Sequence, residues 1–192
     1  MAALIYIHGF LSSPHSYKAQ QIHVWLRQYR PDIAYYCPQL PPYPAETQRI
    51  LEDLVESLRS DPVYLMGSSL GGYWATWLAE KYNLRAVLIN PSVAPYEFMP
   101  QYLEVDLKSY HTDHVFRLQS HHIDELIAVN APILHPENYW LLAQTGDEVL
   151  DYRRAKERYK NSKQTIETGG DHAFQRFELH IKQLISWLEH KS

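Results

Sequence analysis

Cysteine is nearly absent from this chain, and its start shows no targeting segment. Cys37 is the only cysteine among 192 residues, so no disulfide can form within the chain. This composition is compatible with a reducing compartment. The apolar stretch at residues 2–7 is too short for a signal peptide and has no basic residue before it. We therefore expect a cytoplasmic protein.

Long apolar runs and blocks of like charge are lacking as well. No apolar run approaches the roughly 20 residues that cross a bilayer, so we expect no membrane partner. Charged residues make up 21% of the chain, the net charge is −4, and neither sign is concentrated in one segment. A protein that binds nucleic acid usually carries a basic patch, and none is visible here.

Short apolar runs are present in quantity, and they alternate with segments of helical periodicity. Apolar residues make up 45% of the chain, enough for the core of one domain over residues 1–192. The alternation predicts an α/β fold with a mostly parallel sheet of about six strands and helices on both faces. Short crossovers favour the strand order 2-1-3-4-5-6. The predicted strands are residues 4–7, 33–37, 63–66, 86–89, 139–143 and 164–167.

Helices are expected between these strands. Ser13-Pro14 has the composition of a helix start, and Pro31 ends that first helix. The segment 91–136 is irregular and too short to bury much core of its own, so we interpret it as a cap-like insertion. The other predicted helices lie around residues 50–58, 70–82, 123–129, 152–160 and 177–188.

A glycine-flanked serine follows the third predicted strand. The motif Gly67-Ser68-Ser69-Leu70-Gly71 lies between a predicted strand and a predicted helix, the setting of a nucleophile elbow. The five letters alone occur often by chance, but the strand before them and the helix after them do not. Ser69 is therefore the candidate nucleophile. Ser68 is a rival that does not occupy the middle position.

A serine nucleophile needs a base and an orienting acid, which should follow later strands. Asp147 comes after the fifth predicted strand and is the candidate acid. Glu148 and Asp151 are its rivals, although Asp151 could instead cap the next helix. His172 comes after the sixth strand in a Gly-Gly loop and is the candidate base. Its neighbour Asp171 is better explained as a turn residue.

Backbone N–H groups near Ser69 are expected to stabilise a developing oxyanion. One donor should be Leu70, which follows the nucleophile, and the other should be Phe10 or Leu11 in the loop after the first strand. Apolar residues of the insertion could line an acyl pocket, or they could form a small core of the insertion itself. The candidate pocket residues are Leu11, Phe98, Met99 and Tyr102.

Histidine is unusually frequent, with 11 residues. Five lie in or beside the irregular segment: His111, His114, His121, His122 and His135. They could be metal ligands, but no cysteine supports them and their spacing matches no strong zinc signature. We therefore expect no metal and no cofactor.

Five motifs in order resemble those of the small bacterial YqiA-type esterases, the UPF0227 group of α/β-hydrolases. They are YIHGFLSSP at residues 6–14, PQLPPYP at 38–44, GSSLGGY at 67–73, QTGDEVLDY at 144–152 and GGDHAF at 169–174. The resemblance implies a compact α/β-hydrolase with carboxylesterase activity, extending to acyl thioesters. It implies Ser69, Asp147 and His172 as nucleophile, acid and base. Asp171 departs from the asparagine or serine that is common in the family.

Two functional hypotheses follow. The first is a serine hydrolase that cleaves a small acyl ester or thioester through an acyl-enzyme intermediate. The second is a non-catalytic binding module on a hydrolase scaffold, because a fold does not fix a function. Amidase activity is a third option, disfavoured because amides need better protonation of the leaving group. The oligomeric state stays open.

Overall fold

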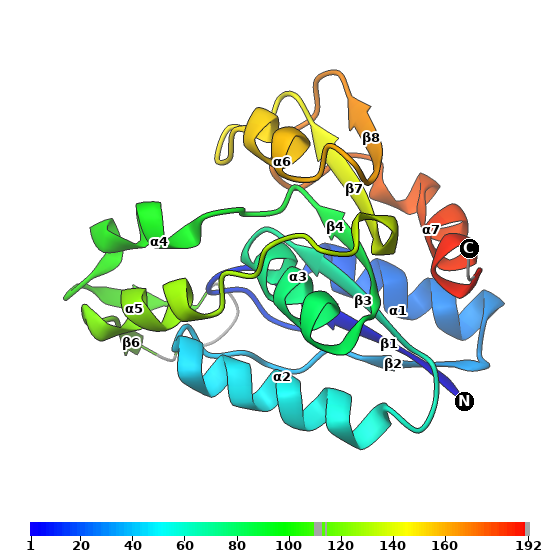
Figure 1. Ribbon diagram of the computed structural model, residues 1–192, viewed down its shortest axis with the longest axis horizontal. Helices are drawn as coiled ribbons and strands as arrows, with labels where there is room; N and C mark the ends of the chain where they lie inside the picture. The colour runs from blue at the N-terminus through cyan, green and yellow to red at the C-terminus, as the bar shows by residue number, and fades with distance from the viewer. Residues whose placement is uncertain (110–112, 114, 191–192) are drawn as a thin grey trace.

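The computed structural model describes residues 1–109, 113 and 115–190. Its centre is a six-stranded sheet in the order β2-β1-β3-β4-β7-β8, with every neighbouring pair parallel (Figure 1). The predicted order of the six strands is thereby confirmed. The strands are β1 (Ala2–Ile7), β2 (Ile33–Tyr36), β3 (Val63–Ser68), β4 (Arg85–Ile89), β7 (Tyr139–Gln144) and β8 (Lys163–Glu167).

Helices cover both faces of this sheet, as the strand pattern predicts. Apolar strand residues are buried on each face, which explains why the runs are continuous rather than alternating. One face packs against α2 (Pro44–Leu58), α3 (Leu70–Tyr82) and α6 (Tyr152–Arg158). The other face packs against α1 (Tyr17–Tyr29) and α7 (Ile181–Glu189).

Two helix starts differ from the sequence prediction. The first helix begins at Tyr17 and not at Pro14, because Ser13 is used in a separate turn. The buried Ser13 accepts hydrogen bonds from the N–H of His15 at its Oγ and from the N–H of Ser16 at its carbonyl oxygen. The last helix begins at Ile181, because a short 3-10 turn over Phe177–Leu179 precedes it.

The segment between β4 and β7 contains more regular structure than the sequence suggests. It holds α4 (Pro95–Phe98), a 3-10 turn (Met99–Tyr102), an antiparallel pair of β5 (Asp106–Lys108) and β6 (Val115–Arg117), α5 (His121–Ala128) and a second 3-10 turn (Pro136–Asn138). Its buried side chains, among them Met99 and Leu126, belong to the same apolar cluster as α2 and α3. Figure 1 shows α4 and α5 to one side of the sheet, at the left. None of the helices described here is long and apolar enough to cross a membrane.

Candidate active site

Ser69 lies in a sharp turn between β3 and α3. Its backbone has φ 56° and ψ −124°, a conformation that residues other than glycine rarely adopt. The flanking glycines make this turn sterically possible. A Cβ atom at Gly67 would lie 2.2 Å from the carbonyl oxygen of Gly71, and one at Gly71 would lie 1.9 Å from that of Ile7. The motif therefore forms a strained turn from strand to helix, as its sequence predicts.

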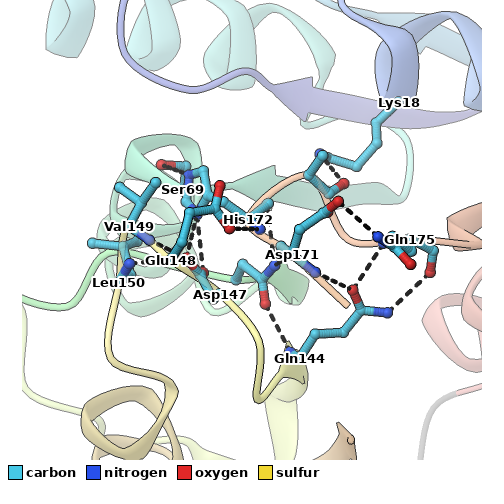
Figure 2. Close-up of polar contacts among 12 residues, drawn as sticks. Lys18, Ser69, Gln144, Asp147, Glu148, Val149, Leu150, Asp171, His172 and Gln175 are labelled. Atoms are coloured by element: carbon cyan, nitrogen blue, oxygen red, sulfur yellow. Dashed lines mark hydrogen bonds and ion pairs between the residues drawn. The ribbon is translucent and has the colours of Figure 1, made fainter. Parts of the chain in front are cut away.

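The structure brings Ser69, His172 and Asp147 into one chain of hydrogen bonds (Figure 2). The Nε2 atom of His172 lies 3.0 Å from the Oγ atom of Ser69. The Nδ1 atom of His172 lies 2.9 Å from each carboxylate oxygen of Asp147. These residues follow β3, β8 and β7, so three carboxyl ends of parallel strands build the site together.

The carboxylate of Asp147 is fixed independently of the histidine. Its side chain is only 2% exposed, and its Oδ1 atom accepts hydrogen bonds of 2.9 Å from the N–H groups of Val149 and Leu150. A buried carboxylate held at this end can orient the imidazole and stabilise its charged form.

The rival acids occupy other positions. Asp151 caps α6, because its carboxylate accepts a 3.0 Å hydrogen bond from the N–H of Arg153. Glu148 is exposed and accepts a 2.9 Å hydrogen bond from the backbone N–H of His172 rather than from the ring. Asp171 bonds to Gln175 through Oδ2. Of these four acids, all within the part of the chain that the structure describes, Asp147 alone contacts the imidazole through its carboxylate.

The two predicted oxyanion donors border the same cleft as Ser69. Leu70 is the first residue of α3, so its N–H has no partner within the helix. Phe10 lies in the turn after β1, and its ring packs 5.5 Å from that of Tyr102, measured between centroids.

The cleft above Ser69 has a volume of about 400 Å³ and is lined by both apolar and polar residues. The apolar lining residues include Phe10, Leu70, Phe98, Tyr102, Val149 and Leu150. The polar lining residues include Ser12, Ser16, Lys18 and Glu148. An adjoining hollow of about 260 Å³ shares Phe98, Tyr102, Val149 and Leu150 with the cleft and extends to Arg154. The site is therefore an elongated groove that is partly apolar.

The structure places the four predicted pocket residues in different surroundings. Phe98 and Tyr102 line the cleft, whereas Met99 and Leu11 do not. Met99 is 1% exposed and packs in the apolar core that also holds residues of α2 and α3. Leu11 has φ 55° and borders a smaller hollow beside Leu40, which shares Gly9, Phe10 and Leu70 with the cleft. Adjacent residues of a short turn point in different directions, which apolarity alone does not reveal.

Lys18 is a cation in the cleft that the sequence did not single out. Its Nζ atom donates a 2.7 Å hydrogen bond to the carbonyl oxygen of Ala173, beside His172. Burial lowers the pKa of Lys18 to about 8, although Asp171 and Asp147 favour its charged form. The lysine therefore ties α1 to the loop that carries the histidine.

The histidines of the insertion show no metal-binding arrangement where the structure describes them. Over residues 1–109, 113 and 115–190, no group of three histidine, cysteine or acidic side chains could hold a metal ion. His122 uses its Nδ1 atom to accept a hydrogen bond from the N–H of Gln119, and its ring lies 3.9 Å from that of His121 between centroids, tilted by 45°. His111 and His114 lie outside the described residues.

The sheet order, the helices on both faces and the serine turn define the α/β-hydrolase fold. The chain belongs to the Uncharacterised protein family UPF0227, whose profile matches residues 3–189. Similar solved structures share this fold at low sequence identity. Est1E from Butyrivibrio proteoclasticus has a TM-score of 0.71 and 14% identity, over 97% of this chain and 85% of that one. The mouse alpha/beta hydrolase domain-containing protein 10 has a TM-score of 0.71 and 19% identity, over 97% and 90% of the two chains. A monoacylglycerol lipase from Paleococcus ferrophilus has a TM-score of 0.68 and 15% identity, over 97% of this chain and 93% of that one.

Proposed function

We propose that this protein is a serine hydrolase that cleaves small acyl esters, with Ser69 as nucleophile, His172 as base and Asp147 as orienting acid. The observation that carries the proposal is the continuous hydrogen-bond chain from Ser69 Oγ through the imidazole to a buried carboxylate. A serine hydroxyl becomes a good nucleophile only when a base takes its proton. The esterase and lipase names of several structural neighbours support the same reaction class.

The geometry leads to a two-step reaction. His172 takes the proton of Ser69 as its Oγ atom attacks the acyl carbonyl carbon, and a tetrahedral oxyanion forms. The backbone N–H groups of Leu70 and Phe10 would stabilise that oxyanion. The imidazolium then gives its proton to the leaving alcohol or thiol, which leaves an acyl-serine ester. Water attacks this ester with His172 again as base, and the acid product leaves.

The cleft favours a small or flexible acyl group. It is open to solvent beside Ser69, its apolar lining residues can contact an acyl chain, and its polar lining residues can contact the leaving group. Both oxygen esters and thioesters fit this arrangement, because each presents the same acyl carbonyl. A steep preference for long insoluble lipids would contradict an open site.

A fluorophosphonate probe tests the assignment directly, because it reacts with an activated serine. We expect labelling of the native protein, and loss of that label in Ser69→Ala but not in Ser68→Ala. Hydrolysis should be measured over p-nitrophenyl esters of increasing acyl length and over the matching CoA thioesters. Loss of Ser69 should lower kcat by at least about 1000-fold. A folded native protein that neither reacts with the probe nor hydrolyses any ester would instead support the binding-module hypothesis.

A further inference from the structure

The loop that carries His172 is held by two buried side-chain amides. Asn90 directly follows β4, and Gln144 ends the neighbouring strand β7. Both side chains are almost completely buried, with 3% and 1% of each residue exposed. The two residues are also joined to each other, because the N–H of Gln144 donates a 3.0 Å hydrogen bond to Asn90 Oδ1.

Gln144 holds the loop on both sides of the histidine (Figure 2). Its Oε1 atom accepts hydrogen bonds from the N–H of Asp171, at 3.2 Å, and of Gln175, at 2.8 Å. Its Nε2 atom donates to the carbonyl oxygen of Gln175 at 3.0 Å and to the carboxylate of Glu167 at 2.8 Å. Two donated and two accepted bonds satisfy the whole amide, so its orientation is fixed.

Asn90 holds the histidine itself. Its Nδ2 atom donates hydrogen bonds of 3.0 Å to the carbonyl oxygen of Asp171 and 3.1 Å to that of His172. Together, Asn90 and Gln144 therefore bond the loop backbone at Asp171, at His172 and at Gln175.

The backbone of the loop is shaped to this contact. Gly170 has φ +74°, and a Cβ atom there would lie 1.9 Å from Gln144 Oε1. The loop approaches the amide so closely that no side chain fits between them. The contact between the loop and the Gln144 amide therefore requires glycine at position 170.

We propose that Asn90 and Gln144 are positioning residues that fix the His172 imidazole between Ser69 and Asp147. The inference rests on the proposed hydrolase function. The Ser69–His172 and His172–Asp147 hydrogen bonds are 3.0 and 2.9 Å long and meet at one imidazole, so a small displacement of the loop would lengthen at least one of them. Misplacement by about 1 Å in such an arrangement costs roughly 100-fold in rate.

Isosteric acids separate the positioning role from simple packing, because a carboxyl group keeps the shape of the amide but lacks its two N–H donors and, when burial protonates it, has a single O–H donor in their place. Asn90→Asp would keep at most one of the two bonds to the carbonyl oxygens of Asp171 and His172. Gln144→Glu would keep its bonds from the loop N–H groups and lose at least one of those to Gln175 and Glu167. Gln144→Met would lose all four bonds.

The experiment compares these three variants with Gln164→Met. Gln164, on the next strand, also donates two hydrogen bonds to backbone carbonyls, those of Lys156 and Tyr159, and lines neither hollow of the groove. We expect kcat for a p-nitrophenyl ester to fall about 10- to 100-fold in Asn90→Asp and Gln144→Met, with KM changed less than about 2-fold. The kcat of Gln144→Glu should lie between that of these two variants and that of the native protein. Gln164→Met should keep the native kcat even if its Tm is lowered.

A second readout does not depend on catalysis. A His172 Nδ1–H held by a buried carboxylate gives a far-downfield proton resonance in NMR, which can be assigned by its loss in His172→Gln. We expect this resonance to shift or vanish in Asn90→Asp and Gln144→Met and to persist in Gln164→Met. Folded Asn90→Asp and Gln144→Glu variants with native kcat and a native resonance would overturn the proposal. If the native protein hydrolyses nothing, the proposed function fails, while the resonance still decides whether the two amides position His172.

Discussion

The carboxylate of Glu148 bonds the backbone N–H of His172, while its neighbour Asp147 bonds the ring of the same histidine. Two consecutive acids thus contact one residue at different points. Both contacts are 2.9 Å long, but Asp147 is buried at 2% side-chain exposure and Glu148 is exposed. Because solvent screens an exposed carboxylate, the two acids should differ greatly in importance.

This relationship predicts different losses for two isosteric substitutions. Asp147→Asn should lower kcat by about 1000-fold or more, because the amide favours the wrong imidazole tautomer and cannot stabilise its charge. Glu148→Gln should lower it by less than about 10-fold, because a glutamine oxygen can still accept the His172 N–H. Steady-state hydrolysis of a short p-nitrophenyl ester measures both. Asp151→Asn is the matched control, since asparagine can also cap α6. Equal losses at Asp147 and Glu148 would contradict the assignment of the acid.

The space around each glycine predicts a sharp difference between a substitution in the serine turn and one in the loop that carries His172. Gly71→Ala should destabilise the fold by more than about 4 kcal/mol or prevent folding, because the new Cβ would lie 1.9 Å from the carbonyl oxygen of Ile7. Gly169→Ala should cost only about 1 to 2 kcal/mol, from its φ of +80°, because nothing lies within 4 Å of the added atom. Urea unfolding followed by circular dichroism compares the two variants. A stable Gly71→Ala protein would show that the turn can relax.

The fold was predictable where the local pattern has a single physical explanation. Runs such as Leu4–Ile7 are apolar throughout because helices cover both faces of the sheet, and the alternation of runs with helical periodicity gives the strand order. The sequence predicts one site from Ser69, Asp147 and His172 because each follows a strand, and the carboxyl ends of these strands lie at the same edge of the sheet. Their meeting in space follows from the parallel topology.

Other features depend on contacts that no local pattern encodes. β5 and β6 have three residues each, too few to show an alternation of buried and exposed side chains. Phe98 and Met99 are both apolar, yet only the first lines the cleft. Asn90 and Gln144 are visible in the sequence as polar residues that end apolar runs. Their hydrogen-bond partners lie in the loop around Asp171, far along the chain, and no local pattern indicates them.

The groove predicts which apolar residues determine acyl-chain preference. Phe98 borders both the cleft over Ser69 and the adjoining hollow, so it should contact the distal part of a longer acyl chain. Phe98→Ala should lower kcat/KM about 10-fold for an octanoyl ester and change it little for an acetyl ester. Met99→Ala should lower the free energy of unfolding by about 2 to 5 kcal/mol and leave the ratio between the two esters unchanged. A similar loss for both esters in Phe98→Ala would mean that the acyl chain lies elsewhere.

The final prediction concerns the pH dependence of stability through Lys18. Burial lowers the pKa of its ammonium group from 10.5 to about 8, which the nearby Asp171 and Asp147 only partly oppose. Between about pH 8 and 10.5 the unfolded chain therefore binds more protons at this residue than the folded chain does. Stability rises with pH wherever the unfolded state binds more protons. Below about pH 8 both states are protonated, and the full cost of burying the charge is present.

The Lys18→Met variant removes this titration and provides the reference. The free energy of unfolding of the native protein, minus that of Lys18→Met, should be constant below about pH 8 and should increase up to about pH 10.5. Urea unfolding at several pH values measures the difference, in which groups that titrate alike in both proteins cancel. The exposed Lys156→Met variant controls for the loss of one positive charge. A difference that stays level, or that decreases with rising pH, would mean that the Lys18 ammonium group is not destabilised by its place beside the His172 loop.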